Sequence, residues 1–573
     1  LNAELIPTLP QLSRCFRRLK PNKSAGYDGI DTNLLRCAPT QIARLTHPIY
    51  VKCAMMAQEP ISRKYGQIVA ILKKLLSTGG QSYRAILLNT ELSKVYHSFQ
   101  RRSLALVVSQ VYRDGQCGGR SHRDSTMVSH TLQAFIHAMR SQRQCGIVFF
   151  IDVEAAFHRV IRHVALHHDY YYDHDDIKTD ILQLTTISGP LRPLLEIIMA
   201  HPGVLQLDNF DEHLACLITQ SHSLTHAHVA NAPTPYVPLR GTRPGNSLAD
   251  AVFCLVFTKP LARAAQQLRL RELLYEPEPK KADYCLLQDP TPTEIADASF
   301  ADDGLFMSAV DSGQHVTTVA RSMVLIVDES MDMHGFKVNY AKGKSAVMAT
   351  LQGHNAGRAR QALYGSTEPR LRFDDPPRHV HVEYQYEHLG TWQDRDGSVS
   401  PQLQRNTTRH RLALTPMQRT TYKLGLPPTV ALYHTDSLAT THLFYHTESW
   451  GPLSKAQSAK LEAALHRGYR SALRLTNGNG KHTTTDTLMH QAKRPPASST
   501  VRVRRLRYLC KLIQFGPRCL LRLLDQGWDQ PSSWVSQLRH DFLWIADHTD
   551  DAGSTIHART TTDWILLIRH SPN

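Results

Sequence analysis

The spacing of apolar residues predicts both helices and strands in this chain. Apolar positions three or four residues apart, separated by polar ones, indicate amphipathic helices at 92–110, 124–143 and 315–334. Short apolar runs indicate strands at 68–72, 83–88 and 147–151. The two kinds of element alternate over the first 400 residues, and the remaining pattern is mostly helical. We therefore expect an α+β protein with a helical C-terminal part.

Several segments lack this periodicity and are predicted to be loops or insertions. Residues 11–37 begin as a helix and continue into a glycine-containing loop. Residues 166–235 are polar and irregular, and we expect a solvated insertion because their His and Asp residues do not have the spacing of a standard metal site. A second insertion is expected at 268–296, where Pro and charged residues gather. Breaks between C-terminal helices are expected at 427–428 and 477–480.

Composition narrows the class of protein. The chain has 573 residues, of which 42% are hydrophobic, so it can bury more than one core. No stretch approaches about 18 consecutive apolar residues, and we expect no membrane partner. Ten scattered cysteines form no CxxC pair, which favours free thiols in a reducing compartment. The chain starts at Leu1 without an initiator Met, and we expect it to be a piece of a longer product.

The net charge of +16 is concentrated in the C-terminal part. After residue 400 the chain has 23 Lys and Arg residues against 11 Asp and Glu residues. Because basic surfaces attract phosphates, this excess indicates a nucleic-acid partner. The densest basic group is predicted to face phosphates, with a solvated helix face as the alternative. It consists of Arg502, Arg504, Arg505 and Arg507.

The candidate chemistry lies in two adjacent aspartates, Asp302 and Asp303. They stand between two apolar runs, which predicts a tight β-hairpin with both carboxylates at its tip. Adjacent acids repel each other unless cations lie between them. Asp152 follows the predicted strand 147–151 and would add a third carboxylate, so that the three could hold two Mg²⁺ ions. An isolated Asp pair, in contrast, is more often an exposed turn.

Eight motifs in consecutive order resemble the reverse transcriptase domain of non-LTR retrotransposons, and more distantly the group II intron enzymes. They lie at 19–30, 83–90, 116–121, 150–157, 240–248, 300–303, 335–342 and 387–390. Phe150-Ile151-Asp152 opens the segment that resembles the first catalytic motif, and Phe300-Ala301-Asp302-Asp303 resembles the aromatic-Ala-Asp-Asp motif. The resemblance extends over residues 15–475.

The resemblance implies a right-hand polymerase fold with fingers, palm and thumb. The corresponding ranges are 1–120 for the fingers, 121–380 for the palm with its two insertions, 381–400 for a primer-grip strand, 401–475 for a helical thumb and 476–573 for a basic helical extension. The implied partners are an RNA template, a DNA primer and dNTPs, and the implied cofactor is a pair of Mg²⁺ ions, with Mn²⁺ as an alternative. An endonuclease upstream of Leu1 and a nuclear or cytoplasmic ribonucleoprotein are also expected.

Roles for single residues follow from the same resemblance. The expected catalytic metal ligands are Asp152, Asp302, Asp303 and the backbone carbonyl of Val153. The expected nucleotide-binding residues are Lys73 or Lys74, Arg84, Phe157, Gly245 and Lys342. Among these, Phe157 would exclude a 2′-hydroxyl, and Gly245 would let the backbone approach the nascent base pair. Leu389 and Gly390 would contact the primer, and the C-terminal arginines would contact phosphates.

Four positions depart from the family pattern: Pro244 replaces Gln, Asn246 replaces Asp, His158 stands where Asp is frequent, and Phe300 replaces the common Tyr. All three expected metal carboxylates are present, so we expect an active RNA-directed DNA polymerase. One alternative is a catalytically inactive descendant that only binds nucleic acid. An RNA-templated RNA polymerase is another, although the Phe157 gate argues against it. A group II intron-type reverse transcriptase or maturase is the third.

Overall fold

The computed structural model describes residues 1–73, 82–162, 166, 203–206, 210–229, 232–238, 240–280, 285–374, 377–475, 484–547 and 560–570. Helices and strands are both present, and the sheets contain both parallel and antiparallel pairs. The chain divides into two compact units. Unit 1 comprises Leu1–Ser121, Ile151–Arg271 and Met323–Asn339, and unit 2 comprises His122–Phe150, Glu272–Ser322 and Tyr340–Asn573. Each unit is therefore assembled from separate stretches of chain.

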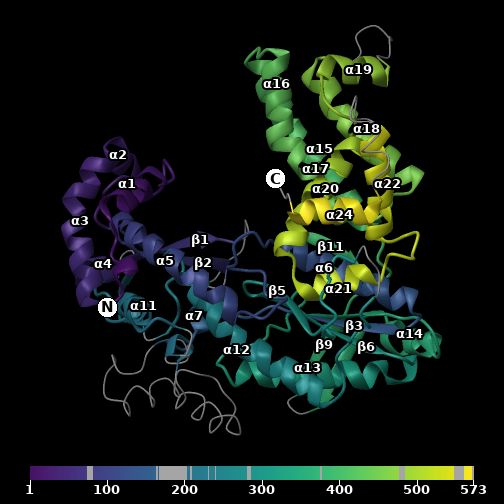
Figure 1. The fold of residues 1–573 in the computed structure, drawn as a ribbon, viewed down its shortest axis with the longest axis horizontal. Coiled ribbons are helices and arrows are strands. Elements are labelled where there is room, and N and C mark those ends of the chain that lie inside the picture. The colour runs from purple at the N-terminus through teal and green to yellow at the C-terminus, as the bar shows by residue number, and fades with distance from the viewer. Residues whose placement is uncertain are drawn as a thin grey trace. The chain divides into compact units, whose positions relative to one another are not determined.

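Unit 1 combines helices with a small mixed sheet (Figure 1). Its helices are α1 (Leu9–Arg17), α2 (Thr32–Cys37), α3 (Pro39–Met56), α4 (Ile61–Lys64), α5 (Glu91–Val111), α7 (Ala156–Arg159), α11 (Glu212–His222) and α12 (Ala249–Leu270). Its strands are β1 (Tyr65–Leu72), β2 (Tyr83–Asn89) and β4 (His226–Val229), in the order β2-β1-β4. β1 pairs with β2 in antiparallel register and with β4 in parallel register.

Two apolar clusters stabilise unit 1. The N-terminal cluster joins α1, α3 and α5, where Phe16, Tyr50 and Tyr96 are fully buried and the two tyrosine rings stack 5.4 Å apart. The second cluster packs Phe253 and Phe257 of α12 against Phe336, with ring centroids 6.0 and 5.5 Å apart. Burial of each large aromatic side chain contributes on the order of 2–3 kcal/mol. Residues 323–339 are therefore part of the core of unit 1 although they lie far along the chain.

Unit 2 is built around a six-stranded sheet of order β5-β6-β3-β7-β9-β8. The strands are β3 (Cys145–Ile151), β5 (Asp297–Phe300), β6 (Asp303–Val310), β7 (Ala346–Thr350), β8 (Arg370–Asp374) and β9 (Pro377–Val382). The boundary between the units falls at the last residue of β3. Strand β3 is central, and all seven of its residues are buried. A separate hairpin joins β10 (Gln385–His388) and β11 (Thr391–Asp394).

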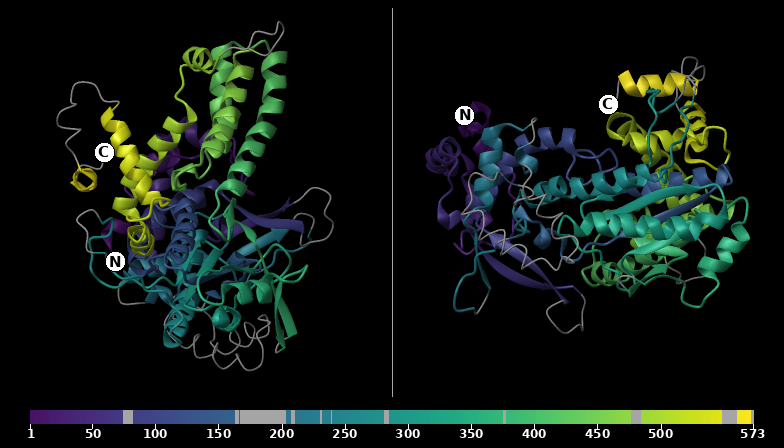
Figure 2. Two further views of the ribbon diagram at one scale, coloured as in Figure 1. Left: turned by 90° about the vertical axis from the view of Figure 1, so that its right-hand side faces the viewer. Right: turned by 90° about the horizontal axis from the view of Figure 1, so that it is seen from below.

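The helices of unit 2 follow mainly after the sheet. They are α6 (Ser125–Ser141), α14 (Ala356–Tyr364), α15 (Ser400–Lys423), α16 (Pro428–His434), α17 (Thr441–Leu443), α18 (Lys455–Ala472), α19 (Thr485–Ala492), α20 (Ala497–Phe515), α21 (Arg518–Asp525), α22 (Trp534–Asp547) and α24 (Thr561–His570). Helix α13 (Val316–Asp332) contributes residues to both units. The left view of Figure 2 shows the green helices that include α15 and α18 running beside one another, and a cluster around Trp450 packs them together.

Most of the predicted elements are confirmed. The helix predicted at 92–110 is α5, which starts where the side chain of Thr90 caps the amide of Ser93. The helix predicted at 124–143 is α6, capped by Asp124. Helix α6 is buried on more sides than its amphipathic pattern indicates, because strands β5 and β7 contact it and α21 and β11 also pack on it (Figure 1).

The prediction that residues 166–235 are irregular is wrong for their second half. Helix α11 begins at an Asp211 cap, and β4 adds a parallel strand to β1. Polar residues hide this order from a search for apolar periodicity, since His222 and Ser221 are buried in hydrogen bonds. The candidate metal residues at 167–176 lie outside the described residues, as does the predicted break at 477–480. Across the described part of the chain, no helix is both long and apolar enough to cross a membrane.

Candidate functional site

The aspartate pair lies at the turn of the hairpin β5–β6, as predicted. Phe300 pairs with Asp303, so Ala301 and Asp302 form a two-residue turn and Asp303 is the first residue of β6. Both aspartates are half-buried. Ala301 has a φ of +56°, a left-handed conformation at the first turn position that glycine usually takes in tight hairpins. The turn therefore stores strain and holds Asp302 at the extreme end of the hairpin.

Asp152 is the first residue after β3, the strand that neighbours β6 in the sheet. The carbonyl of Asp152 accepts the amide of Asn339 at 2.8 Å, and the amide of Glu154 donates to Lys337 at 2.9 Å. Val153, between these two bonds, is buried and forms a bridge with Val338. The backbone that carries the expected ligands Asp152 and Val153 is thus fixed by the segment 337–339.

The expected ligands belong to different units. Asp152 and Val153 lie in unit 1, whereas Asp302 and Asp303 lie in unit 2. Among the described residues, no group of three or more His, Cys, Asp or Glu side chains is arranged to hold a metal ion. The convergence of the three carboxylates therefore stays a prediction.

Phe157 and Gly245, two of the predicted nucleotide-binding residues, line one pocket of unit 1. The pocket has a volume of about 360 Å³ and is lined by Arg101, Phe157, Pro244, Gly245, Asn246, Ala249 and Asp250. The Phe157 ring stacks on Phe253 of α12, with centroids 4.5 Å apart, and stays partly exposed. This ring is therefore both packed and partly accessible, and its role as a gate stays a prediction. We refer to this site below as the Phe157 pocket.

The structure gives a reason for glycine at position 245 that the sequence did not reveal. Its φ is +111°, and a Cβ at this position would lie 2.2 Å from the carbonyl oxygen of Leu87 in β2. The neighbouring Pro244 carbonyl accepts the Leu87 amide at 2.8 Å. Glycine is needed because the loop lies directly against β2. The approach of a base pair to Gly245 stays a prediction.

An ion pair in the Phe157 pocket was missed by sequence reasoning. Arg101 of α5 holds the carboxylate of Asp250 with both terminal nitrogens, one of them at 2.7 Å, and also donates to the carbonyl of Ser247 at 2.7 Å. Hydrogen bonding to Asp250 raises the pKa of Arg101. The two residues are 149 positions apart, and nothing in the local pattern of either segment signals the contact.

The predicted triphosphate cations lie at the end of the β1–β2 pair where β1 ends and β2 begins. Arg84 pairs with Ile71, and the amide of Lys73 continues the ladder by donating to Ser82 at 2.8 Å. Because alternate residues share a face, Lys73 and Arg84 project from the same face of this hairpin. Both are exposed. Lys74 lies outside the described residues.

Lys342 is exposed in the loop before β7, in unit 2. Its charge affects Glu383 and His381 on nearby strands: burial raises the pKa of Glu383, and Lys342 opposes that rise. The role of Lys342 toward pyrophosphate stays a prediction, since Phe157 and Gly245 lie in unit 1.

The expected primer-grip strand is a two-stranded hairpin, which corrects the prediction of a single strand. Leu389 and Gly390 form its two-residue turn, with φ values of +50° and +75°. Positive φ values at both positions are typical of the turns that connect adjacent antiparallel strands, and glycine adopts them readily. The carbonyl of Leu389 accepts the hydroxyl of Tyr445 at 3.2 Å. Tyr386 stacks on Phe150 of β3 at 4.1 Å, which anchors the hairpin on the sheet.

We expect His388→Phe to stabilise the protein. His388 is 3% exposed, and neither ring nitrogen has a hydrogen-bond partner among the described residues. Burial lowers the pKa of His388 to about 3. Below pH 6.5 the imidazole of His388 takes up a proton in the unfolded protein but stays neutral in the folded protein. His388 therefore lowers the unfolding free energy progressively as the pH falls from 6.5 toward 3.

The phenylalanine variant should gain about 1–3 kcal/mol in unfolding free energy at pH 7, and its advantage should grow by about 1.4 kcal/mol for each pH unit below 6.5. Urea unfolding at pH 7 and pH 5 measures both quantities. His354→Phe, at an exposed position, is the control and should show neither gain. A gain in unfolding free energy that does not increase from pH 7 to pH 5 would contradict the interpretation that the buried imidazole of His388 is neutral.

The predicted phosphate-facing arginines of α20 are largely engaged within the protein, which corrects that prediction for Arg505. Arg505 is 3% exposed and bonds Asp541 at 2.5 Å and the Trp450 carbonyl at 3.3 Å. Arg504 bonds Glu448 at 3.1 Å, and Arg502 lies 3.6 Å from Asp541 with its guanidinium over the Trp544 ring. Of the four, only Arg507 is exposed. Arg505 therefore cannot face a phosphate, whereas phosphate contacts of Arg502, Arg504 and Arg507 stay a prediction.

A basic surface that the sequence analysis did not single out lies along α15 and α18. Two adjoining hollows share Gln404 and Thr408, and Arg405 and Arg409 line one of them. Arg411, Lys460 and Arg467 line the other. Within these hollows Glu387 is the one acidic side chain, and it pairs with Arg405. We call this surface the α15–α18 groove. The basic residues that recur along both helices are a sequence signal for this surface, although they are less dense than the arginines of α20.

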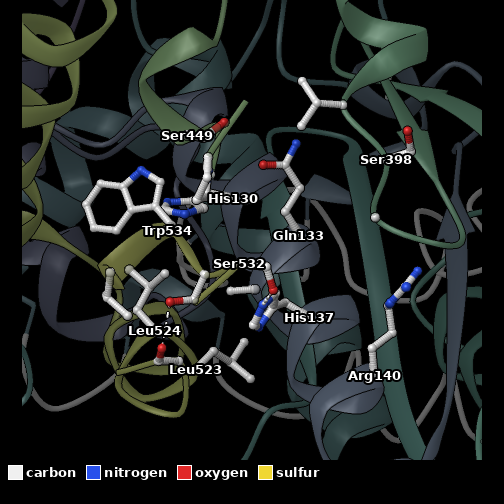
Figure 3. Close-up of a pocket in the computed structure, with 18 of the residues that line it drawn as sticks. His130, Gln133, His137, Arg140, Ser398, Ser449, Leu523, Leu524, Ser532 and Trp534 are labelled. Atoms are coloured by element: carbon white, nitrogen blue, oxygen red, sulfur yellow. Dashed lines mark hydrogen bonds between the residues drawn. The ribbon is translucent and has the colours of Figure 1, made fainter. Parts of the chain in front are cut away.

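Another pocket of unit 2, partly lined by α6, is less suited to a ligand (Figure 3). His130, Gln133, His137 and Arg140 project into it from one side of α6, and its volume is about 310 Å³. Most of its polar groups already bond within the protein: His137 meets Ser532 at 3.3 Å, Ser533 donates to Gly527, and Arg140 bonds the Asp396 carbonyl. Burial lowers the pKa of His130 to about 3, so this ring adds no charge. The pocket is therefore part of the packing around α6.

The chain was also compared with known proteins. No known protein family matches it, and no curated protein matches it.

Proposed function

We propose that this protein is an RNA-directed DNA polymerase with a right-hand arrangement of fingers, palm and thumb, from a non-LTR retrotransposon. The observation that carries the proposal is the placement of the aspartates on neighbouring strands. Asp152 follows the buried strand β3, and Asp302 and Asp303 lie at the turn that begins β6, its neighbour in the sheet. The family that the motifs resemble uses carboxylates on two such strands for nucleotidyl transfer.

The residues fit a pair of Mg²⁺ ions in chemistry. Carboxylate oxygens are preferred Mg²⁺ ligands, and each of the three aspartates is half-buried at the end or the start of a strand. Asp152 and Asp302 would hold both ions, and Asp303 and the Val153 carbonyl would complete the set. Bound there, the metals would activate the primer hydroxyl and neutralise the triphosphate. Lys73 and Arg84 would add positive charge beside the phosphates.

Primer extension tests the proposal. Purified protein is supplied with an RNA template annealed to a DNA primer, with dNTPs, and with or without Mg²⁺. We expect Mg²⁺-dependent addition of template-directed deoxynucleotides. Binding of the template–primer without any extension would instead support the catalytically inactive alternative, and extension with ribonucleotides alone would support an RNA polymerase.

Phe157→Ala should relax the selection of the sugar. The ring lines the pocket that Gly245 also lines, and its volume is what would exclude a 2′-hydroxyl. We expect the preference for dNTP over rNTP to fall by about tenfold or more, since a steric clash of a few kcal/mol is removed. Single-nucleotide incorporation with each substrate measures the ratio. Phe253→Leu, which changes the ring beneath Phe157, is the packing control, and an unchanged ratio in Phe157→Ala would make Phe157 a core residue only.

The α15–α18 groove should carry phosphate contacts. Replacing Arg411 and Arg467 by Gln removes two charges, and each phosphate contact contributes about 0.7–0.9 to the slope of log affinity against log salt. We therefore expect the slope to flatten by about 1.5 for every sequence alike. Fluorescence anisotropy of a labelled RNA–DNA duplex between low and moderate salt measures it.

The matched control replaces two exposed arginines of α14, Arg358 and Arg360, by Gln. It removes the same formal charge from unit 2 outside the groove. Equal flattening in both pairs would show that only net charge matters, and the groove would lose its assignment.

A further inference from the structure

A buried hydrogen-bonded chain reaches the Phe157 pocket from the N-terminal segment. His97 of α5 contacts both carboxylate oxygens of Glu59 through Nε2, at 2.9 and 3.0 Å. Nδ1 of the same ring lies 2.9 Å from Nδ2 of Asn246. All three side chains are buried, and His97 is fully so. The chain thus joins residues separated by 38 and 149 positions in the sequence.

A backbone amide fixes the direction of every hydrogen bond that links Asn246, His97 and Glu59. The Leu248 amide can only donate, and it donates to Oδ1 of Asn246 at 3.0 Å. Nδ2 of Asn246 is therefore the atom that faces His97, and it donates to Nδ1 of the ring. Nδ1 accepts, so the single ring proton lies on Nε2 and is donated to Glu59. His97 is neutral in this arrangement, and Glu59 is ionised.

The surroundings favour an ionised Glu59. Burial alone would raise the pKa of this carboxyl, but the hydrogen bond from His97 and the charges of Arg243 and Lys64 lower it below its ordinary value. Burial lowers the pKa of Lys64 itself to about 8, and its ammonium group bonds Gln220 and Ser223. Arg243 is held by the carbonyls of Ser221 and Lys64 at 2.8 and 3.0 Å.

The hydrogen bonds that link Glu59, His97 and Asn246 explain why position 246 is Asn rather than the Asp of the family pattern. A carboxylate at position 246 would place an acceptor oxygen against the lone pair of Nδ1, which is repulsive unless the ring takes a second proton. The amide of Asn246 instead supplies the donor that a neutral His97 requires. The departure at position 246 and the presence of His97 are therefore complementary.

Asn246 also belongs to the wall of the Phe157 pocket. The turn 243–248 begins with Arg243, which is anchored on α4 and α11, and passes Gly245, which lies against β2. It ends at α12, whose first residues Ala249 and Asp250 complete the wall. On the α5 side, the side chain of Asn246 ties this turn to His97.

We propose that Glu59 and His97 are positioning residues that hold Asn246, and through it the turn 243–248, in the orientation that admits a deoxynucleoside triphosphate to the Phe157 pocket. This inference rests on the proposed polymerase function for its ligand. The positioning itself rests only on the buried bonds. Neither Glu59 nor His97 touches the pocket directly, since neither is among its lining residues.

Asn246→Asp tests the proposal by two independent measurements. The first is ¹⁵N NMR of the imidazole nitrogens, with the His97 signals assigned by their absence from His97→Asn. We expect the neutral Nε2–H form in the parent and a doubly protonated ring in Asn246→Asp. The second is the KM for dNTP in single-nucleotide incorporation. We expect a rise of about tenfold or more, with the Kd for template–primer changed less than twofold, because small displacements of positioning groups have large effects.

Two substitutions of His97 separate positioning from the general loss of a buried ring. The side chain in His97→Asn is short and can place an acceptor near the Nδ1 position, whereas that in His97→Gln reaches only toward Glu59. We expect a smaller rise in KM for His97→Asn than for His97→Gln. Gln100→Glu introduces a carboxylate at another buried position of α5 and should lower stability without raising the KM.

The outcomes are distinct. A ring that stays neutral in folded Asn246→Asp, together with an unchanged KM, would overturn the proposal, and so would equal KM values for the two His97 variants. If Asn246→Asp does not fold, the two His97 variants decide. If the parent incorporates no nucleotide, the polymerase proposal fails, whereas the NMR measurement still decides whether Glu59 and Asn246 hold His97 neutral.

Discussion

Asp302→Asn should abolish primer extension while leaving template–primer binding nearly intact. The substitution removes the charge of a proposed metal ligand but keeps the shape of the side chain in the β5–β6 turn. Loss of a ligand shared by two ions removes several kcal/mol of transition-state stabilisation, so we expect the rate to fall by about a thousandfold or more. Single-turnover extension measures the rate, and anisotropy of a labelled duplex measures binding.

Asp311→Asn is the matched control. Asp311 lies one residue beyond the opposite end of β6, is exposed, and accepts a hydrogen bond from Gln144 at 2.7 Å. The same chemical change there should leave extension within about twofold of the parent, as surface substitutions usually do. If Asp302→Asn keeps a tenth of the parent rate, the assigned role of Asp302 is refuted.

Arg505→Gln should destabilise the C-terminal helices more than any other single change at the α20 arginines. Arg505 and Asp541 are both buried, and Asp541 is also contacted by Arg502 and Gln537. Without Arg505, the buried Asp541 keeps the contacts to Arg502 and Gln537 but loses its shortest ion pair, and breaking a buried ion pair costs about 3–5 kcal/mol. Urea unfolding followed by tryptophan fluorescence measures this loss, since Trp450 and Trp544 lie beside the pair.

Arg507→Gln serves as the control because Arg507 is exposed on the same helix. It should change the unfolding free energy by less than about 0.5 kcal/mol. A double replacement of Arg505 and Asp541 by Leu should recover much of the loss, because apolar residues can replace a buried ion pair. Equal effects of Arg505→Gln and Arg507→Gln would show that the buried pair has no special weight.

The sequence predicted well where a local pattern determines the structure. The two-residue turn at Ala301-Asp302 follows from apolar runs on both sides of an Asp pair, and α5 follows from the periodic apolar residues of 92–110. The pairing of Phe157 with Gly245 in one pocket was predicted only through the family resemblance. Periodicity alone would assign Phe157 to a core.

The sequence predicted poorly where the contacts are distant along the chain and polar. Arginine is rarely buried, so nothing distinguished Arg505 from Arg507 two positions away. The bond between His97 and Asn246 spans 149 residues, and no pattern in either segment indicates it. Helix α11 was hidden because its buried face includes Ser221 and His222, whose hydrogen bonds satisfy them inside the protein.

The discontinuous composition of unit 1 has a consequence for synthesis on the ribosome. The first 121 residues emerge early, but Phe336 and Val338, which complete the core and the bridge to Val153, emerge more than 200 residues later. At about 5–20 residues per second, this interval lasts on the order of 10–40 s. Helix α12 ends at Leu270, so its aromatic residues Phe253 and Phe257 lack Phe336 while the last 66 residues of this interval are made, on the order of 3–13 s. A pause in translation or a premature stop within the interval would therefore leave apolar surface exposed, and a nascent-chain chaperone would find its longest opportunity there.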